Sequence, residues 1–241
     1  MSDEQRPEVP DARDAPEAAD LRDAPAAGAA RRVAPGPRAL RSLVPFEIAA
    51  FVVLAIAPLP DRIPIAMPLF AVASVSRWVR RRTWAEVLHA ERWVCAVSTV
   101  AGLVALAGAL ALGTPVVEAL TGRGVEWSAA PIVRGNVVTG VMVAVIAAVI
   151  AAITELALRG WIVERVLELS PGPAVLPVLI GALAEALIAP GGLAVRLGAA
   201  VFGVGLGAIY VAAGRDVMAP IYARAAFALG AVVLEMLRLI G

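Results

Sequence analysis

Seven apolar stretches, several of them long enough to cross a lipid bilayer, limit what this chain can fold into. A helix rises about 1.5 Å per residue, so roughly 20 apolar residues are needed to cross a hydrocarbon core about 30 Å thick. Of the 241 residues, 60% are hydrophobic, and the mean hydropathy of the chain is +0.83. The sequence therefore predicts an all-α fold: a polytopic membrane helical bundle with about seven transmembrane helices.

Proline and glycine clusters separate the apolar stretches and set their expected ends. The fourth stretch contains no proline until Ser170-Pro171-Gly172-Pro173 ends it. A short surface helix is expected at 116–120, in the polar connection before it, and Gly203 and Gly207 form a small-xxx-small pair that lets a neighbouring helix approach closely. The seven expected spans are residues 43–58, 63–79, 93–112, 136–169, 174–189, 193–213 and 217–239.

The first 40 residues differ from the rest, because they are rich in Ala, Pro, Asp, Glu and Arg and contain few large apolar side chains. Such a segment cannot bury enough apolar surface to fold, so residues 1–40 are predicted to be a disordered cytoplasmic tail. Arginines gather at its end and again at residues 77–92, beside three tryptophans. Arginine-rich segments favour the cytoplasmic side. The chain is therefore expected to be a multi-pass protein of the inner or plasma membrane with a cytoplasmic N-terminus.

We divide the rest of the chain into N-terminal helices and connections at 41–131 and a helical core at 132–241. Charge and composition exclude several classes of function. The 21 basic and 20 acidic residues nearly cancel, so no nucleic-acid partner is expected, and the predicted partner is the lipid bilayer. Cys95 is the single cysteine, which excludes a disulfide framework, and His89 is the single histidine. Neither a metal site of the usual ligand type nor a cofactor is expected.

Two opposite charges, Glu155 and Arg159, interrupt the fourth apolar stretch. Residues four apart lie on one face of a helix, within reach of each other. An unpaired charge in hydrocarbon is costly, so both side chains should face the bundle interior and pair. Three charges farther along, Glu164, Arg165 and Glu168, fall in the last turns of this stretch and are expected in water.

A second acidic residue is expected at the same depth in the membrane. The turn that begins at Ser170 makes spans four and five antiparallel neighbours, and Glu155 and Glu185 lie 15 residues before and after it. Both carboxylates should therefore lie roughly 20 Å from the turn. Arg224 follows the last hairpin turn closely enough for its long side chain to reach the same layer. The sequence predicts one charge-balanced cluster of Glu155, Arg159, Glu185 and Arg224.

Two interpretations of this cluster follow from its residues alone. Two carboxylates in one low-dielectric site can divide the roles of acid and base between them. Nearby arginines oppose that use, because they hold both carboxylates in the charged form. The simpler alternative is a structural network in which four buried charges satisfy one another, since buried pairs need not catalyse anything.

Three segments also carry a family pattern. The first reads Thr154-Glu155-Leu156-Ala157-Leu158-Arg159-Gly160, the second Gly181-Ala182-Leu183-Ala184-Glu185, and the third VFGVGLGAIYVAAGRDVMAPIYARAAFAL. Over about residues 136–230 their order and spacing resemble the CPBP intramembrane proteases, which include type II CAAX prenyl proteases and bacteriocin-processing or immunity proteins. That family's motifs are E-E-x-x-x-R, F-x-x-x-H and a glycine-rich helix followed by H-x-x-x-N.

The resemblance implies where catalytic residues would stand. In the family, the first glutamate and the first histidine activate water, and the second histidine and the asparagine stabilise the oxyanion. This sequence has Thr154, Glu185, Arg224 and Ala228 at those four positions, and matches the motifs only at the second glutamate and the arginine. The first interpretation is therefore a non-catalytic member of this family that binds a peptide, a lipid-modified chain or another membrane protein.

Two other functions stay open at this point, and with them the question of whether the chain is an enzyme. One is a working glutamic-type endopeptidase in which Glu155 or Glu185 acts as general base and Arg224 stabilises the oxyanion. The other is a small transporter or channel, for which charges inside the membrane are also typical. No inverted repeat or pair of broken helices is visible in the two halves of the sequence, which speaks against a transporter.

Overall fold

The structure is a computed structural model that describes residues 41–60, 63–89, 91–122, 131–170, 172–173 and 175–240. Within these ranges every regular element is a helix, which confirms the predicted all-α fold. The predicted disordered tail, residues 1–40, lies outside the described residues. The α-helices are α2 (Val44–Ile56), α3 (Ala66–Val79), α4 (Arg92–Gly108), α5 (Thr114–Thr121), α6 (Val137–Ala157), α7 (Glu164–Leu169), α8 (Val175–Ile188), α9 (Leu193–Ala212) and α10 (Met218–Met236).

Short 3-10 and π-helical turns precede or join several of these helices. The π-helical turn η3 (Ala109–Gly113) continues α4 into α5, and the π-helical turn η5 (Leu158–Val163) continues α6 into α7. The 3-10 turns η2 (Trp84–Val87) and η4 (Pro131–Val133) precede α4 and α6. The helix expected at 116–120 is thus present as α5, but it prolongs the third span and does not stand apart from it.

Four helical runs are long and apolar enough to cross a membrane: Arg92–Ala119, Val137–Leu169, Leu193–Ala212 and Met218–Met236. Many of their large apolar side chains are exposed on the outside of the molecule, as expected where lipid is the solvent. The chain therefore has the character of a multi-pass membrane protein. Helices α2, α3 and α8 are also apolar, but they contain only 13, 14 and 14 residues.

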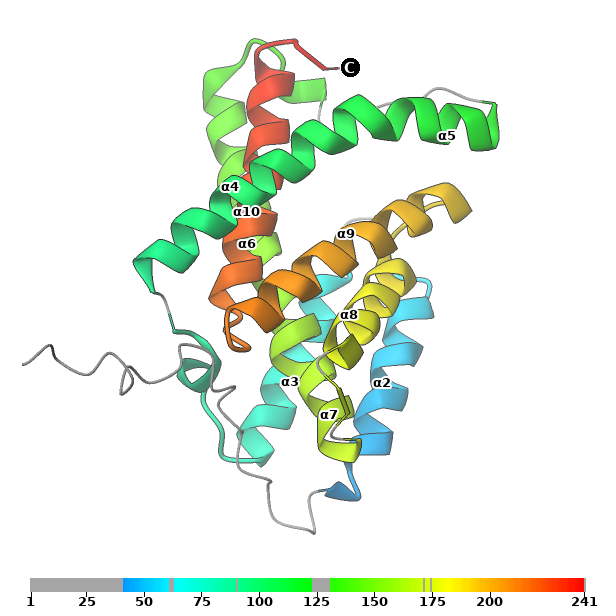
Figure 1. The fold of residues 1–241 in the computed structure, drawn as a ribbon, viewed down its shortest axis with the longest axis vertical. Helices are drawn as coiled ribbons and strands as arrows, with labels where there is room; N and C mark the ends of the chain where they lie inside the picture. Colours follow the sequence, from blue (N-terminus) through cyan, green and yellow to red (C-terminus); the bar gives the residue numbers. More distant parts are fainter. Residues whose placement is uncertain are drawn as a thin grey trace, which may run out of the picture.

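The helices pack as one bundle that mixes both parts of the chain. Helix α4 packs on α10, α10 on α6, and α3 on α6, so helices from residues 41–131 contact helices from residues 132–241. Figure 1 shows α6 and α10 along the long axis of the molecule, with α4 and α5 crossing them obliquely. Helices α8 and α9 form a close pair beside them.

Two glycines explain how closely α8 and α9 approach. A Cβ atom on Gly203 would lie 2.8 Å from the Cα of Ala182, and one on Gly207 would lie 2.8 Å from the Cα of Val178. Any larger residue at either position would push the helices apart. The close approach expected from this small-xxx-small pair is confirmed, and it places Glu185 of α8 against the backbone of α9.

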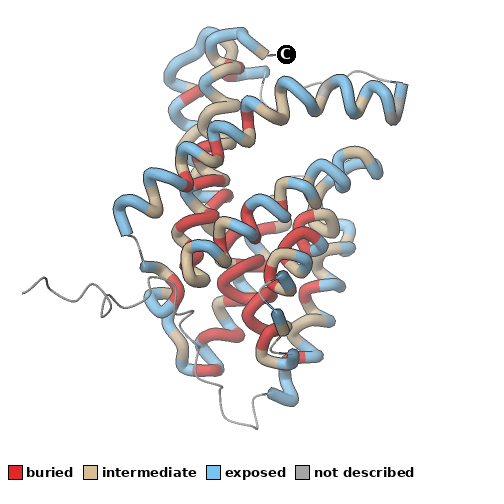
Figure 2. Tube along the Cα trace, viewed as in Figure 1, coloured by how far each residue is buried: buried red, intermediate tan, exposed pale blue. Residues whose placement is uncertain are grey.

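The core of the bundle surrounds the π-helical turn η5. All six residues of η5 are buried, and Trp161 is packed edge-on against Phe51 of α2 at 6.2 Å between ring centroids. Leu69 of α3 and Tyr210 of α9 belong to the same buried cluster. Figure 2 shows the buried residues gathered where these helices meet, while the outward turns are exposed. The charged segment in the middle of the fourth stretch therefore lies at the centre of the fold.

The expectation that the end of this stretch lies in water is wrong. Glu164 and Arg165 are buried, and the Tyr210 hydroxyl donates to the Glu164 carboxylate at 2.5 Å. Arg165 donates from Nη1 to Oε1 of Glu168 at 2.7 Å. Helix α2 packs against α7, and Tyr210 of α9 contacts Glu164, so helices distant in sequence cover a segment that the sequence places near a helix end.

Arg77 of α3 and Arg80 at its C-cap are buried as well, although they belong to the arginine-rich segment that the sequence places toward the cytoplasm. Arg80 pairs with Glu47 of α2 at 2.9 Å and with Glu168 of α7 at 3.1 Å. The Ser76 hydroxyl donates to Glu47 at 2.7 Å. This ion-pair network ties α2, α3 and α7 together at one end of the bundle. Trp78, by contrast, is 79% exposed, as expected for a tryptophan at a membrane interface.

Candidate functional site

The four charged residues singled out in the sequence contact one another. Arg159 of η5 places Nη1 at 3.0 Å from Oε2 of Glu155 on α6 and at 2.7 Å from Oε1 of Glu185 on α8. Arg224 of α10 donates from Nε to Glu155 and from Nη2 to Glu185. Each carboxylate therefore contacts both guanidinium groups. The structure brings together the whole predicted cluster; its chemical role remains a prediction.

Two glycines make room for the Arg159 side chain in the middle of the bundle. Its Nη2 donates to the backbone carbonyl of Gly203 at 3.1 Å. A Cβ atom on Gly181 would lie 3.3 Å from Arg159 Nε, closer than most side-chain contacts allow. Gly203 also lets α8 approach, so one small residue both admits Glu185 and offers its carbonyl to the arginine.

The cluster is almost completely shielded from solvent. The side chains of Glu155 and Arg159 are 0% exposed, while those of Glu185 and Arg224 are 5% and 17% exposed. Two carboxylates and two guanidinium groups cancel in charge. Removing four charges from water is costly, and their mutual attraction and hydrogen bonds offset that cost only while all four stay together. The arrangement therefore suits a stable, neutral network inside the membrane.

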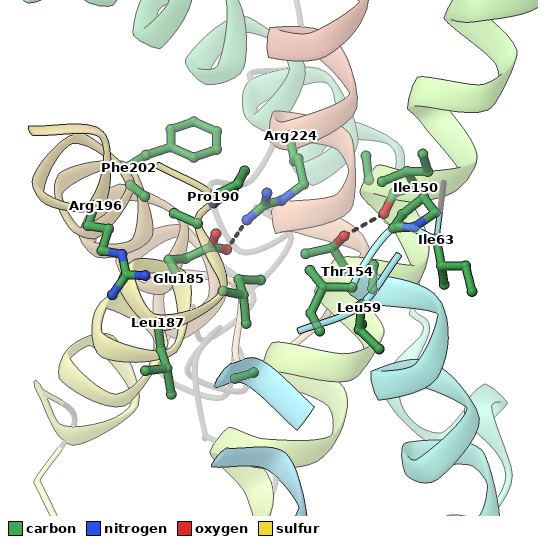
Figure 3. A pocket seen from close by; sticks show the side chains of 18 of the residues that line it. Leu59, Ile63, Ile150, Thr154, Glu185, Leu187, Pro190, Arg196, Phe202 and Arg224 are labelled. Atoms are coloured by element: carbon green, nitrogen blue, oxygen red, sulfur yellow. Dashed lines mark hydrogen bonds and ion pairs between the residues drawn. The ribbon is translucent and has the colours of Figure 1, made fainter. Parts of the chain in front are cut away.

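A cavity of about 980 Å³ opens beside this network (Figure 3). It lies between the end of α2, the start of α3, and α6, α8, α9 and α10. Most of the side chains that line it are apolar. The polar or charged ones are Thr154, Glu185, Arg196 and Arg224. The Thr154 hydroxyl donates to the carbonyl of Ile150 at 2.7 Å, and Glu185 points toward Arg224.

The positions at which the resemblance would put catalytic residues all face this cavity. Thr154 of α6, Glu185 of α8, and Arg224 and Ala228 of α10 belong to its lining. They come from three helices and from segments up to 74 residues apart in the chain, so their meeting is a property of the fold. Glu155 and Arg159 do not belong to the lining.

Arg196 is the lining residue that sequence reasoning missed. It lies near the start of α9, on the same face as Ala199 and Phe202, which also line the cavity. A single arginine in an otherwise apolar turn, with no acidic residue three or four positions away, was the available signal. Without the fold, nothing in the sequence separates this arginine from one that reaches the membrane surface.

The remaining candidate groups lie outside the cluster. Among the described residues, no group of three or more His, Cys, Asp and Glu side chains could hold a metal ion. The backbone N–H of His89 donates to Asp216 at 3.1 Å, in the connection that precedes α4. Cys95 lies in α4 as a free thiol.

Comparisons with known proteins give no relative for this chain. No protein-family model matches the sequence, and no curated protein and no solved structure matches it. The CPBP resemblance therefore rests on the order and spacing of the three segments quoted above. Any function drawn from it is a proposal, which must be supported by the geometry of the cavity and the cluster.

Proposed function

We propose that this chain is a non-catalytic integral membrane protein with a CPBP-like helical core, and that its cavity binds a peptide, a lipid-modified chain or a segment of a membrane partner. One observation carries the proposal: the four positions that correspond to catalytic residues in the family line one cavity. They hold Thr154, Glu185, Arg224 and Ala228, a set that supports binding better than catalysis.

The chemistry of these side chains supports the absence of catalysis. A general base must reach its water and must have a pKa near the working pH. The Thr154 hydroxyl is a poor base and already donates to Ile150. Oε1 of Glu185 already accepts hydrogen bonds from Arg159 and Arg224, which leaves it poorly available to a water molecule. No imidazole belongs to the lining.

The proposal includes a topology. We place the protein in the inner or plasma membrane with about seven spans and a cytoplasmic N-terminus, so that α2, α3 and α8 are its shorter spans. Two arginine-rich segments, before α2 and after α3, would then face the cytoplasm. This topology puts the cavity toward the opposite side, because it lies at the end of α2 and the start of α3.

The test combines cleavage and binding in one preparation. Purified full-length protein is incubated with a peptide library and with prenylated peptides, beside the variants Glu155→Gln and Glu185→Gln. We expect no cleavage by any of the three, and saturable binding of a prenylated peptide that Ala228→Trp, which fills the cavity, weakens at least tenfold. Cleavage by the wild type that either glutamine substitution abolishes would instead support the second candidate, a protease that uses Glu155 and Glu185.

A further inference from the structure

One short segment, residues 83–89, connects two parts of the bundle that are far apart in the sequence. It follows α3 and contains the 3-10 turn η2, and it contacts both η5 and the connection between α9 and α10. None of its residues belongs to the lining of the cavity. Any effect of this segment on the cavity must therefore act through the elements that it contacts.

The first contact fixes the start of α10. The backbone N–H of Val217, the N-cap residue of this helix, donates to the carbonyl of Val87 at 3.1 Å. Oδ1 of the neighbouring Asp216, which is buried, accepts from the N–H of Met218 at 2.9 Å and from the N–H of His89 at 3.1 Å. The first N–H groups of a helix have no partner within it. The Asp216 carboxylate satisfies one of them and ties α10 to the segment.

The second contact covers the π-helical turn η5. A Cβ atom on Gly160 would lie 3.1 Å from Cζ3 of Trp84, closer than most side-chain contacts allow, so the indole ring lies directly on the backbone of η5. The same ring stacks on Phe70 of α3 at 5.3 Å between ring centroids. Gly160 directly follows Arg159 in the sequence. Trp84 therefore holds the turn that carries this arginine.

The two contacted elements supply both arginines of the buried cluster. Arg159 belongs to η5, and Arg224 lies in the second turn of α10. Helix α10 also supplies Phe227 and Ala228 to the cavity wall. Each carboxylate of the cluster contacts both guanidinium groups, so a shift of either element would leave charges inside the bundle uncompensated. The position of the segment is thus connected to the charge balance and the shape of the site.

The segment is accessible from water and can open more easily than the helices around it. Thr83, Ala85, Glu86 and His89 are exposed. A 3-10 turn is less favourably hydrogen-bonded than an α-helix, and short exposed segments open locally at a smaller cost in free energy than the core does. In the proposed topology, the arginine-rich stretch that leads into this segment faces the cytoplasm. Its contacts with η5 and α10 therefore link the cytoplasmic surface to the cavity.

We propose that residues 83–89 are a clamp that regulates the cavity. The closed clamp holds Arg159 and Arg224 in the cluster and α10 in its binding position; the open clamp releases α10 and lowers the affinity of the cavity for its ligand. This inference rests on the proposed binding function and adds its regulation. Coupling between two sites is reciprocal, so a ligand that binds only the closed form also holds the clamp closed. Asp216 is the positioning residue, because its carboxylate bonds both the clamp and α10.

The experiment uses full-length protein in phosphatidylcholine nanodiscs with a farnesylated peptide, one of the prenylated peptides above, as probe. Hydrogen exchange, followed by mass spectrometry, should slow at least threefold in residues 83–89 and 214–218 when the peptide is saturating, although neither segment lines the cavity. Asp216→Ala should speed exchange in both segments and weaken peptide binding at least fivefold. Asp216→Asn, which keeps an oxygen acceptor at the same position, should retain most of the affinity.

The matched control removes the cap of another helix that lines the cavity. Asn136 caps α6 by accepting from the N–H of Thr139 at 3.0 Å, and it lies outside both the clamp and the cavity lining. Asn136→Ala should also lower the melting temperature, but it should leave peptide affinity unchanged. The clamp is refuted if the wild type binds the peptide without slower exchange in residues 83–89, or if Asp216→Ala and Asn136→Ala alter affinity equally. Absence of peptide binding by the wild type would overturn the proposed function, and this inference with it.

Discussion

Arg77 of α3 donates from Nη1 to the backbone carbonyl of Gly160 at 3.2 Å, across 83 residues of sequence. Gly160 lies inside the π-helical turn η5, where the regular ladder of helical hydrogen bonds is disturbed. The guanidinium group also donates to the Thr83 carbonyl and lies 4.7 Å from the centre of the Trp84 ring. A neighbouring helix thus fixes the turn that carries Arg159 into the buried cluster.

The first prediction concerns this contact. Arg77→Gln should lower the free energy of unfolding by about 1–3 kcal/mol, because it removes the guanidinium donor from the buried carbonyl of Gly160. Arg92→Gln, at an exposed arginine, should change it by less than about 0.5 kcal/mol. Thermal unfolding in one detergent, followed by circular dichroism, compares the two. Similar melting temperatures for both variants would mean that Arg77 does not stabilise η5.

The buried cluster could be predicted because its members obey local geometry. Glu155 and Arg159 are four residues apart, and equal distances from the turn at Ser170 placed Glu185 at the same depth. Helical rise and one hairpin are enough for that inference. To place Arg224 in the same layer, the prediction used its position shortly after the last hairpin turn and the length of an arginine side chain. Each step used a single helix or two helices that are adjacent in sequence.

The buried charges at the end of α7 could not be predicted in the same way. Burial of Arg165 and Glu164 depends on α2 and α9, which are far away in sequence. The pairing of Arg80 with Glu47 and Glu168 likewise joins three separate helices. Charges near the end of an apolar stretch are usually solvated, so only the tertiary packing reveals these pairs. The cavity and Arg196 were missed for the same reason.

The second prediction separates close packing from helix propensity within α9. Gly203→Ala should lower the free energy of unfolding by about 1–3 kcal/mol, because its Cβ would lie 2.8 Å from atoms of Ala182 and Glu185. Gly205→Ala is the matched control: a Cβ there meets nothing within 4 Å. That change should be neutral, or stabilising by up to about 1 kcal/mol, because alanine favours a helix. Equal effects in chemical or thermal unfolding would contradict the observed approach of α8.

The third prediction tests the topology. Reporter fusions after residue 40 and after residue 85 should both give cytoplasmic signals, because α2 and α3 form a hairpin that returns to the side on which it starts. Pro58→Cys, placed in a Cys95→Ser background, should react with a membrane-impermeant maleimide added outside intact cells. Reaction only after permeabilisation would show that α2 and α3 enter the membrane without crossing it, and would reduce the number of spans.

The fourth prediction concerns charge balance in the buried cluster. Arg159→Met leaves Glu155 and Glu185 facing Arg224 alone, and the uncompensated carboxylate should cost about 3–5 kcal/mol of unfolding free energy. Adding Glu155→Gln restores neutrality, since Glu185 and Arg224 can still pair. The double variant should therefore be more stable than Arg159→Met, by more than about 1 kcal/mol.

The choice of control decides whether this comparison is informative. Arg165 lies on the same helical run, but its side chain is buried and paired with Glu168, so its removal would be costly for reasons of its own. Arg92, which is exposed in α4, is the appropriate reference, and Arg92→Met should alter the melting temperature little. If Glu155→Gln instead destabilises the wild type and the Arg159→Met variant by the same amount, the two residues act independently. In that case neutrality of the cluster is not what keeps four charges inside the membrane.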